Sequence, residues 1–117
     1  MIIIIGTPFI DDVSYNRSSQ TIICTSTGGP ATSVTWTKDT IPLKVDGTTY
    51  QHSQIITDTV TATYENRLTI LGDDEEDAYG IYVCTVSNSM GSDTSEIKIS
   101  GNWVDKTTMH RSSFLLE

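Results

Sequence analysis

The stretch Tyr82-Val83-Cys84-Thr85-Val86-Ser87-Asn88-Ser89-Met90-Gly91 decides the fold class. Tyr82, Cys84 and Val86 alternate with the residues between them, so their side chains would share one face of a strand whose other face meets solvent. Residues 88–91 are typical of a turn, because Asn bonds its own backbone and Gly tolerates a positive φ. The stretch predicts a half-buried antiparallel strand that ends in a tight turn.

The same period of two recurs in four other segments. Their inward-facing residues would be Ile22 and Cys24, Val34 and Trp36, Leu68 and Ile70, and Ile97 and Ile99. Turn clusters rich in Gly, Asp, Ser and Thr separate the segments at short spacing. Isoleucine is the commonest apolar residue and alanine is scarce, so no helix is expected. The pattern predicts an all-β sandwich, with the candidate core residues Trp36, Leu68 and Tyr82.

Length and charge restrict the possible roles. A chain of 117 residues has the size of one domain. Its net charge of −8 and the absence of a basic cluster argue against a nucleic-acid partner or an anionic lipid surface. The longest apolar run, Ile2 to Ile5, is far shorter than the roughly 20 residues that span a bilayer. We therefore expect a domain that is not itself inserted in a membrane, which leaves open a membrane-anchored parent protein.

The two cysteines, Cys24 and Cys84, both fall on inward-facing strand positions. A bridge between them would close a long loop and stabilise the domain by about 4 kcal/mol. The alternative is a pair of buried free thiols in a cytosolic protein. The two histidines, His52 and His110, form no metal-binding spacing with each other or with the cysteines, so no zinc site is expected.

Between Phe9 and Ser100 these residues resemble the immunoglobulin superfamily. That family has a Cys, a Trp about a dozen residues later and a Tyr two places before the second Cys, which here are Cys24, Trp36, Tyr82 and Cys84. The resemblance implies an immunoglobulin-like two-sheet sandwich with an inter-sheet disulfide. It also implies that the Trp ring packs across the disulfide and that the Tyr hydroxyl bonds back to the preceding turn.

Two further stretches are similar to the I-set subgroup. The run from Tyr82 to Gly91 is similar to its Y-x-C-x-A-x-N-x-x-G pattern, and Tyr64–Ile70 is similar to its S-L-x-I strand. One departure is that Ala78 stands where the family commonly has Asp, with Asp77 one place early. Without that Asp and its Arg partner, the resemblance implies an I-set or intermediate domain that lacks the ion pair of variable-type domains.

The ends of the chain are outside this pattern. Residues 1–6 could form a first strand that is interrupted near Pro8, and we assign residues 1–100 to the domain. Residues 101–117 lie beyond the last expected strand, as a linker toward a following module or as vector-derived sequence. The strands between Ile41 and Thr59 are not located by the pattern.

The acidic run Asp73–Asp77 contributes most of the net charge. It predicts a solvated corner, and divalent-ion binding is the alternative, although the run lacks the spaced ligands of a calcium loop. No catalytic motif is present: there is no nucleophile elbow, zinc-protease motif or phosphate loop. We therefore expect no enzymatic activity, no cofactor and no bound metal.

Binding is the remaining role. If Tyr82, Cys84 and Val86 point inward, the residues between them point outward beside Thr35 and Thr37 and form an apolar row on a sheet face. The alternative is that β-branched residues there only favour strand geometry. The candidate interface residues are Tyr79, Ile81 and Val83 on this strand, followed by Asn88 and Met90 in the next turn.

Asn16-Arg17-Ser18 is an N-glycosylation triplet, which agrees with a disulfide in favouring an extracellular setting. The resemblance implies a non-catalytic recognition or adhesion domain of a cell-surface receptor, or of a secreted protein. Its partner would be a protein ligand or a second copy. The alternative is a structural spacer in a tandem array of such domains, extracellular or in a cytosolic filament.

Overall fold

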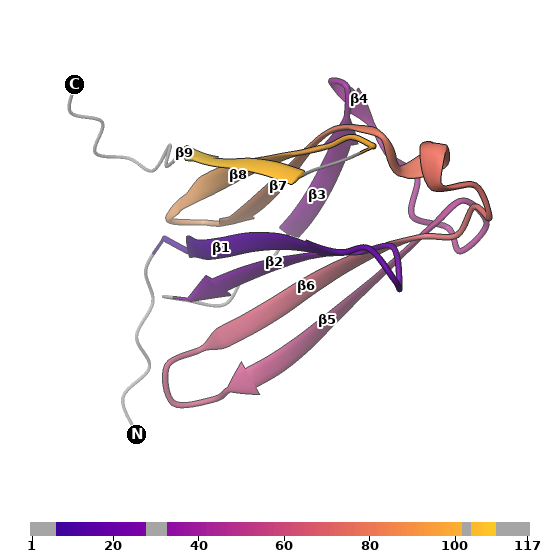
Figure 1. Ribbon diagram of the computed structural model, residues 1–117. Coiled ribbons are helices and arrows are strands. Elements are labelled where there is room, and N and C mark those ends of the chain that lie inside the picture. The colour runs from indigo at the N-terminus through magenta and orange to yellow at the C-terminus, as the bar shows by residue number, and fades with distance from the viewer. Residues whose placement is uncertain (1–6, 28–32, 102–103, 110–117) are drawn as a thin grey trace.

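The chain folds into two stacked antiparallel sheets (Figure 1). The computed structural model describes residues 7–27, 33–101 and 104–109. In these ranges the elements are β1 Phe9–Asn16, β2 Thr21–Thr27, β3 Ser33–Lys38, β4 Ile41–Pro42, β5 Tyr50–Asp58, β6 Thr63–Ile70, the 3₁₀ turn η1 Glu75–Ala78, β7 Gly80–Asn88, β8 Gly91–Ile99 and β9 Val104–Met109. Sheet A has the strand order β1-β2-β6-β5 and sheet B the order β4-β3-β7-β8-β9. The predicted all-β sandwich is confirmed.

Strand register explains why the alternating residues form one core. In sheet A, Ile22 of β2 lies opposite Leu68 of β6, and both side chains are fully buried. In sheet B, Trp36 of β3 lies opposite Cys84 of β7, and both are buried as well. Because directly opposed residues point to the same face, each sheet presents one apolar surface to the other.

The two sheets are joined covalently. Cys24 of β2 and Cys84 of β7 form a disulfide, with their Cα atoms 6.6 Å apart. Trp36 belongs to the same buried cluster as both cysteines. The predicted inter-sheet bridge is therefore confirmed, and no cysteine in the chain remains a free thiol.

The expected hydrogen bond of the Tyr82 hydroxyl is wrong. This oxygen is buried and has no hydrogen-bond partner among the residues that the structure describes. The turn is held by other bonds: the carbonyls of Asp74 and Glu76 accept backbone N–H bonds within it, and that of Asp77 accepts a 2.9 Å bond from Lys38 Nζ. The Lys38 ammonium lies 5.6 Å from the centre of the Tyr82 ring, and burial raises the pKa of this phenol well above its ordinary value.

The region that the pattern could not locate forms β4 and β5. β4 is only two residues long, whereas β5 pairs along its length with β6 and forms one edge of sheet A. Figure 1 shows the end of the β5–β6 hairpin projecting away from sheet B. Because little of sheet B faces it there, β5 exposes most of its side chains, including Ile55 and Ile56.

The segment after residue 100 differs from the expectation of a linker. Val104–Met109 forms β9, which pairs antiparallel with β8. The edge of β8 offers backbone donors and acceptors, and Val104, Thr107 and Thr108 are β-branched residues that favour a strand. The expected strand in residues 1–6 and the tail after residue 109 lie outside the described residues. No helix among the described residues is long and apolar enough to cross a bilayer.

The β3–β4 turn contains local strain that a single substitution would relieve. Asp39 and Thr40 have φ values of 52° and 71°, as in a type I′ hairpin turn. The left-handed region is unfavourable for β-branched Thr and open to Gly, and Thr40 is exposed. We expect Thr40→Gly to raise the free energy of unfolding by about 1 kcal/mol in urea denaturation. The control Thr35→Gly, within β3, should lower the free energy of unfolding. If both substitutions lowered it equally, Thr40 would not be strained.

His52 should make stability depend on pH. It faces inward from β5, edge-on to Trp36 with ring centres 6.4 Å apart, and its buried Nε2 has no hydrogen-bond partner in the described part of the chain. Desolvation lowers its pKa in the folded state, so protonation favours unfolding. Stability should therefore fall as the pH drops through the unfolded-state value of about 6.5. Thermal melts from pH 7.5 to 5 should show this loss in the wild type and in the control His110→Gln, and less of it in His52→Gln. An unchanged profile in His52→Gln would exclude His52 as the cause.

Candidate functional site

The outer face of sheet B is a polar surface with a small apolar centre. Directly opposed residues define its rows: Thr35, Thr85 and Thr94, then Thr37, Val83 and Glu96, then Ile81 and Lys98. These residues point away from the core because their strand neighbours are buried within it. Of the apolar row that was expected on this face, Ile81 and Val83 point outward, and the other residues in these rows are threonines or charged residues.

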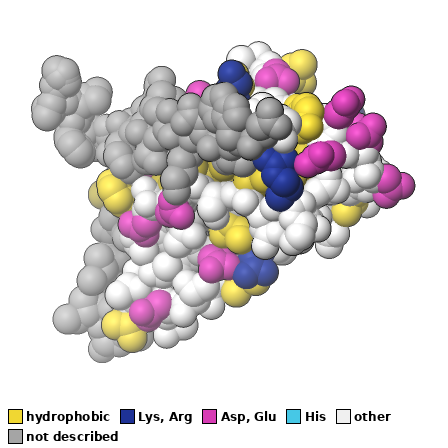
Figure 2. Space-filling model, viewed as in Figure 1, with side chains coloured by type: hydrophobic (Ala, Val, Ile, Leu, Met, Phe, Trp, Pro, Cys, Tyr) yellow, Lys and Arg dark blue, Asp and Glu magenta, His cyan; other side chains and the backbone are white. Residues whose placement is uncertain are grey.

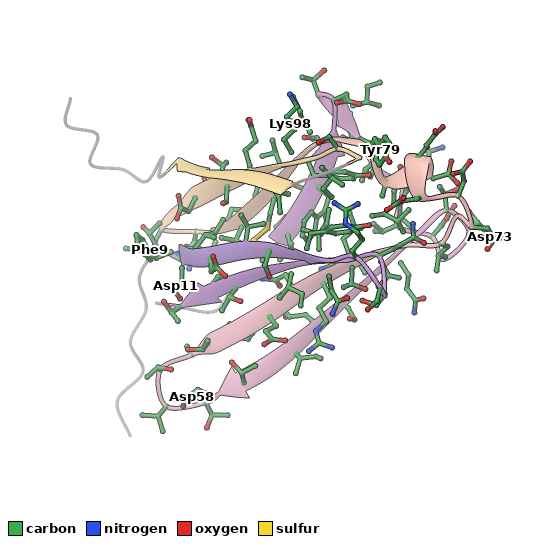
Figure 3. All side chains as sticks on the ribbon, viewed as in Figure 1. Phe9, Asp11, Asp58, Asp73, Tyr79 and Lys98 are labelled. Atoms are coloured by element: carbon green, nitrogen blue, oxygen red, sulfur yellow. A yellow bond between two sulfur atoms is a disulfide. The ribbon has the colours of Figure 1, made fainter. Side chains whose placement is uncertain are left out.

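Among the residues of this face whose exposure is described, Ile81 is the most exposed large apolar one, at 36%. Its position is fixed by the β3–β4 turn, since its backbone N–H donates to Asp39 Oδ1 at 3.0 Å and its carbonyl accepts from the Asp39 N–H at 2.8 Å. The neighbouring Lys98 points outward from the sheet (Figure 3). Ile81 thus sits on a central, rigidly held strand next to an exposed ammonium group.

Tyr79 does not belong to this row. β7 begins at Gly80, and Tyr79 instead follows the 3₁₀ turn, where it is partly buried and packs against the core. The period of two fails here because Gly80 has a φ of 152° and joins the turn to the strand. The outward position predicted for Tyr79 is therefore wrong, whereas Ile81 and Val83 remain on the outer face.

The β7–β8 turn forms a second exposed apolar site. Asn88 Oδ1 accepts a 2.8 Å bond from the Met90 N–H, and Gly91 has a φ of 157°, so the predicted turn chemistry is present. The Met90 side chain is 54% exposed, and its carbonyl accepts a bond from Thr7 Oγ1. Phe9, also exposed, lies at this same end of the sandwich, opposite the end that holds the acidic corner (Figure 3).

A buried carboxylate holds β1 against β8 at this end. Asp93 is fully buried, and its two oxygens accept bonds from the backbone N–H groups of Ile10 at 2.8 Å and Thr94 at 3.0 Å. Asp93 was not among the residues predicted from the sequence. The sequence does contain an indication of its position. Asp93 alternates in step with Ser95 and Ile97, and this pattern places a charged residue on the core face of the strand.

The acidic corner is a capped and partly paired turn. Asp74 Oδ1 accepts the Glu76 N–H at 3.1 Å, and Glu75 pairs with Arg17 at 3.0 Å. Figure 2 shows acidic side chains gathered at the end of the molecule where this turn lies. Among the described residues, no group of three His, Cys, Asp or Glu side chains is arranged to hold a metal ion.

The cysteines and His52 are not arranged for nucleophilic catalysis. Both cysteine sulfurs are in the disulfide. His52 faces the core beside Trp36, with its Nε2 buried, and His110 lies outside the described residues. The exposed side chains of the described residues include hydroxyl and charged groups and large apolar groups such as Phe9, Ile81 and Met90. Such groups are suited to contacts between surfaces.

Comparison with known proteins agrees with this architecture. A family model described as "Immunoglobulin domain" matches residues 5–88. Nephrin of Rattus norvegicus and nephrin of Mus musculus are each 30% identical to the chain over 84 residues. The matched part is 72% of this chain and 6% of either relative, so the chain spans a small fraction of their length. With its two sheets, its Cys24–Cys84 bridge and its buried Trp36, the chain belongs to the immunoglobulin domain family.

Proposed function

We propose that this domain is a non-catalytic extracellular recognition module that binds a protein partner through the outer face of sheet B. The observation that carries the proposal is the exposed Ile81 on central strand β7, surrounded by hydroxyl-bearing and charged side chains. Protein interfaces commonly place an apolar anchor within a ring of polar groups that exclude water.

The frame beneath this face supports such a role. β7 is hydrogen-bonded on both sides, by β3 and β8, and the disulfide joins it to sheet A. A surface that is ordered before binding loses little conformational entropy when a partner docks. Glu96 and Lys98 contribute opposite charges to the part of the face formed by β7 and β8. The negative charge gathered at the distant corner would instead disfavour acidic partners near that end.

The extracellular setting is supported by the disulfide. Structural disulfides persist in oxidising compartments and are rare in the cytosol. The same domain in a cytosolic filament would keep Cys24 and Cys84 as thiols. A secreted parent and an anchored parent at the cell surface are both compatible with this proposal.

Two matched substitutions test the binding face. Ile81 and Ile55 are similarly exposed, at 36% and 39%, but lie on sheet B and sheet A respectively. We expect Ile81→Arg to weaken binding at least about tenfold, because loss of an interface anchor costs about 2 kcal/mol. Ile55→Arg should leave binding unchanged. Self-association is measured by sedimentation equilibrium up to high micromolar concentration, and ligand binding against a panel of purified cell-surface ectodomains.

Thermal melts verify that both variants remain folded. A loss of binding in Ile55→Arg alone would move the interface to sheet A, and a loss in Met90→Arg alone would move it to the β7–β8 turn. A monomer that binds nothing in either assay would contradict recognition and favour the spacer role.

A further inference from the structure

The outer face of sheet A contains a polar hollow of about 360 Å³. This volume lies within the range of about 300–1,000 Å³ that is typical of small-ligand sites. Beside Asn16, its lining is Ser19, Thr21, Ile23, Ser53, Arg67 and Thr69. The hollow therefore offers hydroxyl groups, a guanidinium group and one apolar side chain, next to the asparagine of the only N-x-S/T triplet in the sequence.

Strand register places the asparagine over this face. Asn16, the last residue of β1, lies opposite Thr21 of β2, and Thr21 lies opposite Thr69 of β6. The Thr21 and Thr69 hydroxyls are 3.2 Å apart. Arg67 is oriented by Glu65 Oε1, which accepts bonds from its Nη2 at 2.6 Å and its Nε at 3.1 Å. The floor of the hollow is thus ordered by contacts within the protein.

The local turn leaves one atom of Asn16 available. Asn16 Oδ1 accepts three hydrogen bonds, from the Ser18 N–H at 3.1 Å, the Ser18 hydroxyl at 2.8 Å and the Ser19 N–H at 3.2 Å. The Asn16 side chain is exposed, and its Nδ2 forms no hydrogen bond with the residues that the structure describes. The Ser18 hydroxyl, which the triplet requires, therefore fixes the amide while Nδ2 faces solvent.

We propose that Asn16 carries an N-linked glycan and that its first sugar, an N-acetylglucosamine, lies in this hollow. The donor would be an oligosaccharide linked to a polyprenyl diphosphate. Nδ2 attacks the anomeric carbon of that sugar and forms a C–N bond. The C–O bond to the diphosphate breaks, the lipid diphosphate leaves with the electron pair, and Nδ2 loses one proton. The hydroxyls and acetamido group of the sugar then bond to Ser19, Thr69 and Arg67, with an apolar ring face on Ile23.

The two outer faces would then have different roles. A glycan seated in the hollow covers part of the outer face of sheet A and leaves sheet B exposed to a protein partner. Glycosylation rests on one part of the proposed function, the secretion of the domain to an extracellular setting. It does not depend on the binding face of sheet B. Its readout is the mass of the secreted chain, so failure of one proposal is distinguishable from failure of the other.

Attachment is tested on the chain secreted from mammalian cells that make only high-mannose glycans. We expect the intact mass to fall on treatment with peptide-N-glycosidase F, with Asn16 converted to Asp in the released peptide. Asn16→Gln and Ser18→Ala should abolish the shift, and Ser18→Thr should retain it. A wild-type chain whose mass is unaffected by the enzyme would overturn the proposal.

Binding of the first sugar in the hollow is tested by comparing a chain that keeps this sugar with one from which it has been removed. Endoglycosidase H leaves a single N-acetylglucosamine on Asn16, whereas peptide-N-glycosidase F removes it. We expect the melting temperature of the first product to exceed that of the second by about 4 °C. The product without sugar carries Asp at position 16, so its melting temperature should equal that of the Asn16→Asp variant. This comparison separates the effect of the new charge from the effect of the sugar. In Arg67→Ala the sugar should remain attached and the difference should largely vanish. If the two wild-type products melted at the same temperature, or if Arg67→Ala left their difference unchanged, the sugar would not be bound in the hollow.

Discussion

The Cys24–Cys84 bridge is the constraint on which the rest of the structure depends. It joins β2 of sheet A to β7 of sheet B, and the buried Trp36 lies in the same cluster. A domain of this size has only a modest core, and a covalent link between residues far apart in sequence lowers the entropy of the unfolded chain by an amount worth about 4 kcal/mol. With β7 anchored in this way, its outward side chains, Ile81 above all, are held on a rigid frame.

The architecture was predictable because the period of two is a local signal. Each buried strand exposes one face to the core, so alternation around Ile22, Trp36, Leu68 and Tyr82 identifies the inward set without knowledge of which strands pair. β5 lacks this signal because most of its side chains are exposed, which is why the region around it could not be located. The pairing of β9 depends on the edge of β8, a tertiary feature that sequence alone does not show.

The candidate site was predictable only in part. Ile81 and Val83 lie outward as the alternation requires, but Tyr79 precedes the strand and packs inward because the chain changes conformation at Gly80. The Tyr82 hydroxyl has no partner among the described residues, and a carbonyl of the preceding turn instead accepts a bond from Lys38, a contact that arises only from the three-dimensional arrangement. The hollow beside Asn16 likewise assembles residues from four strands and a turn, so the triplet alone could not indicate it.

The most direct test of this account measures how strongly the bridge stabilises the domain. Urea unfolding of the oxidised chain is compared with that of the double variant Cys24→Ala/Cys84→Ala, with near-ultraviolet circular dichroism reporting the packing of the Trp36 ring. The account predicts a loss of about 4 kcal/mol in the free energy of unfolding, because the bridge closes a loop across a 60-residue separation. A loss below about 1 kcal/mol, with the native dichroism retained, would show that the sheets hold together without the bridge and would contradict the account.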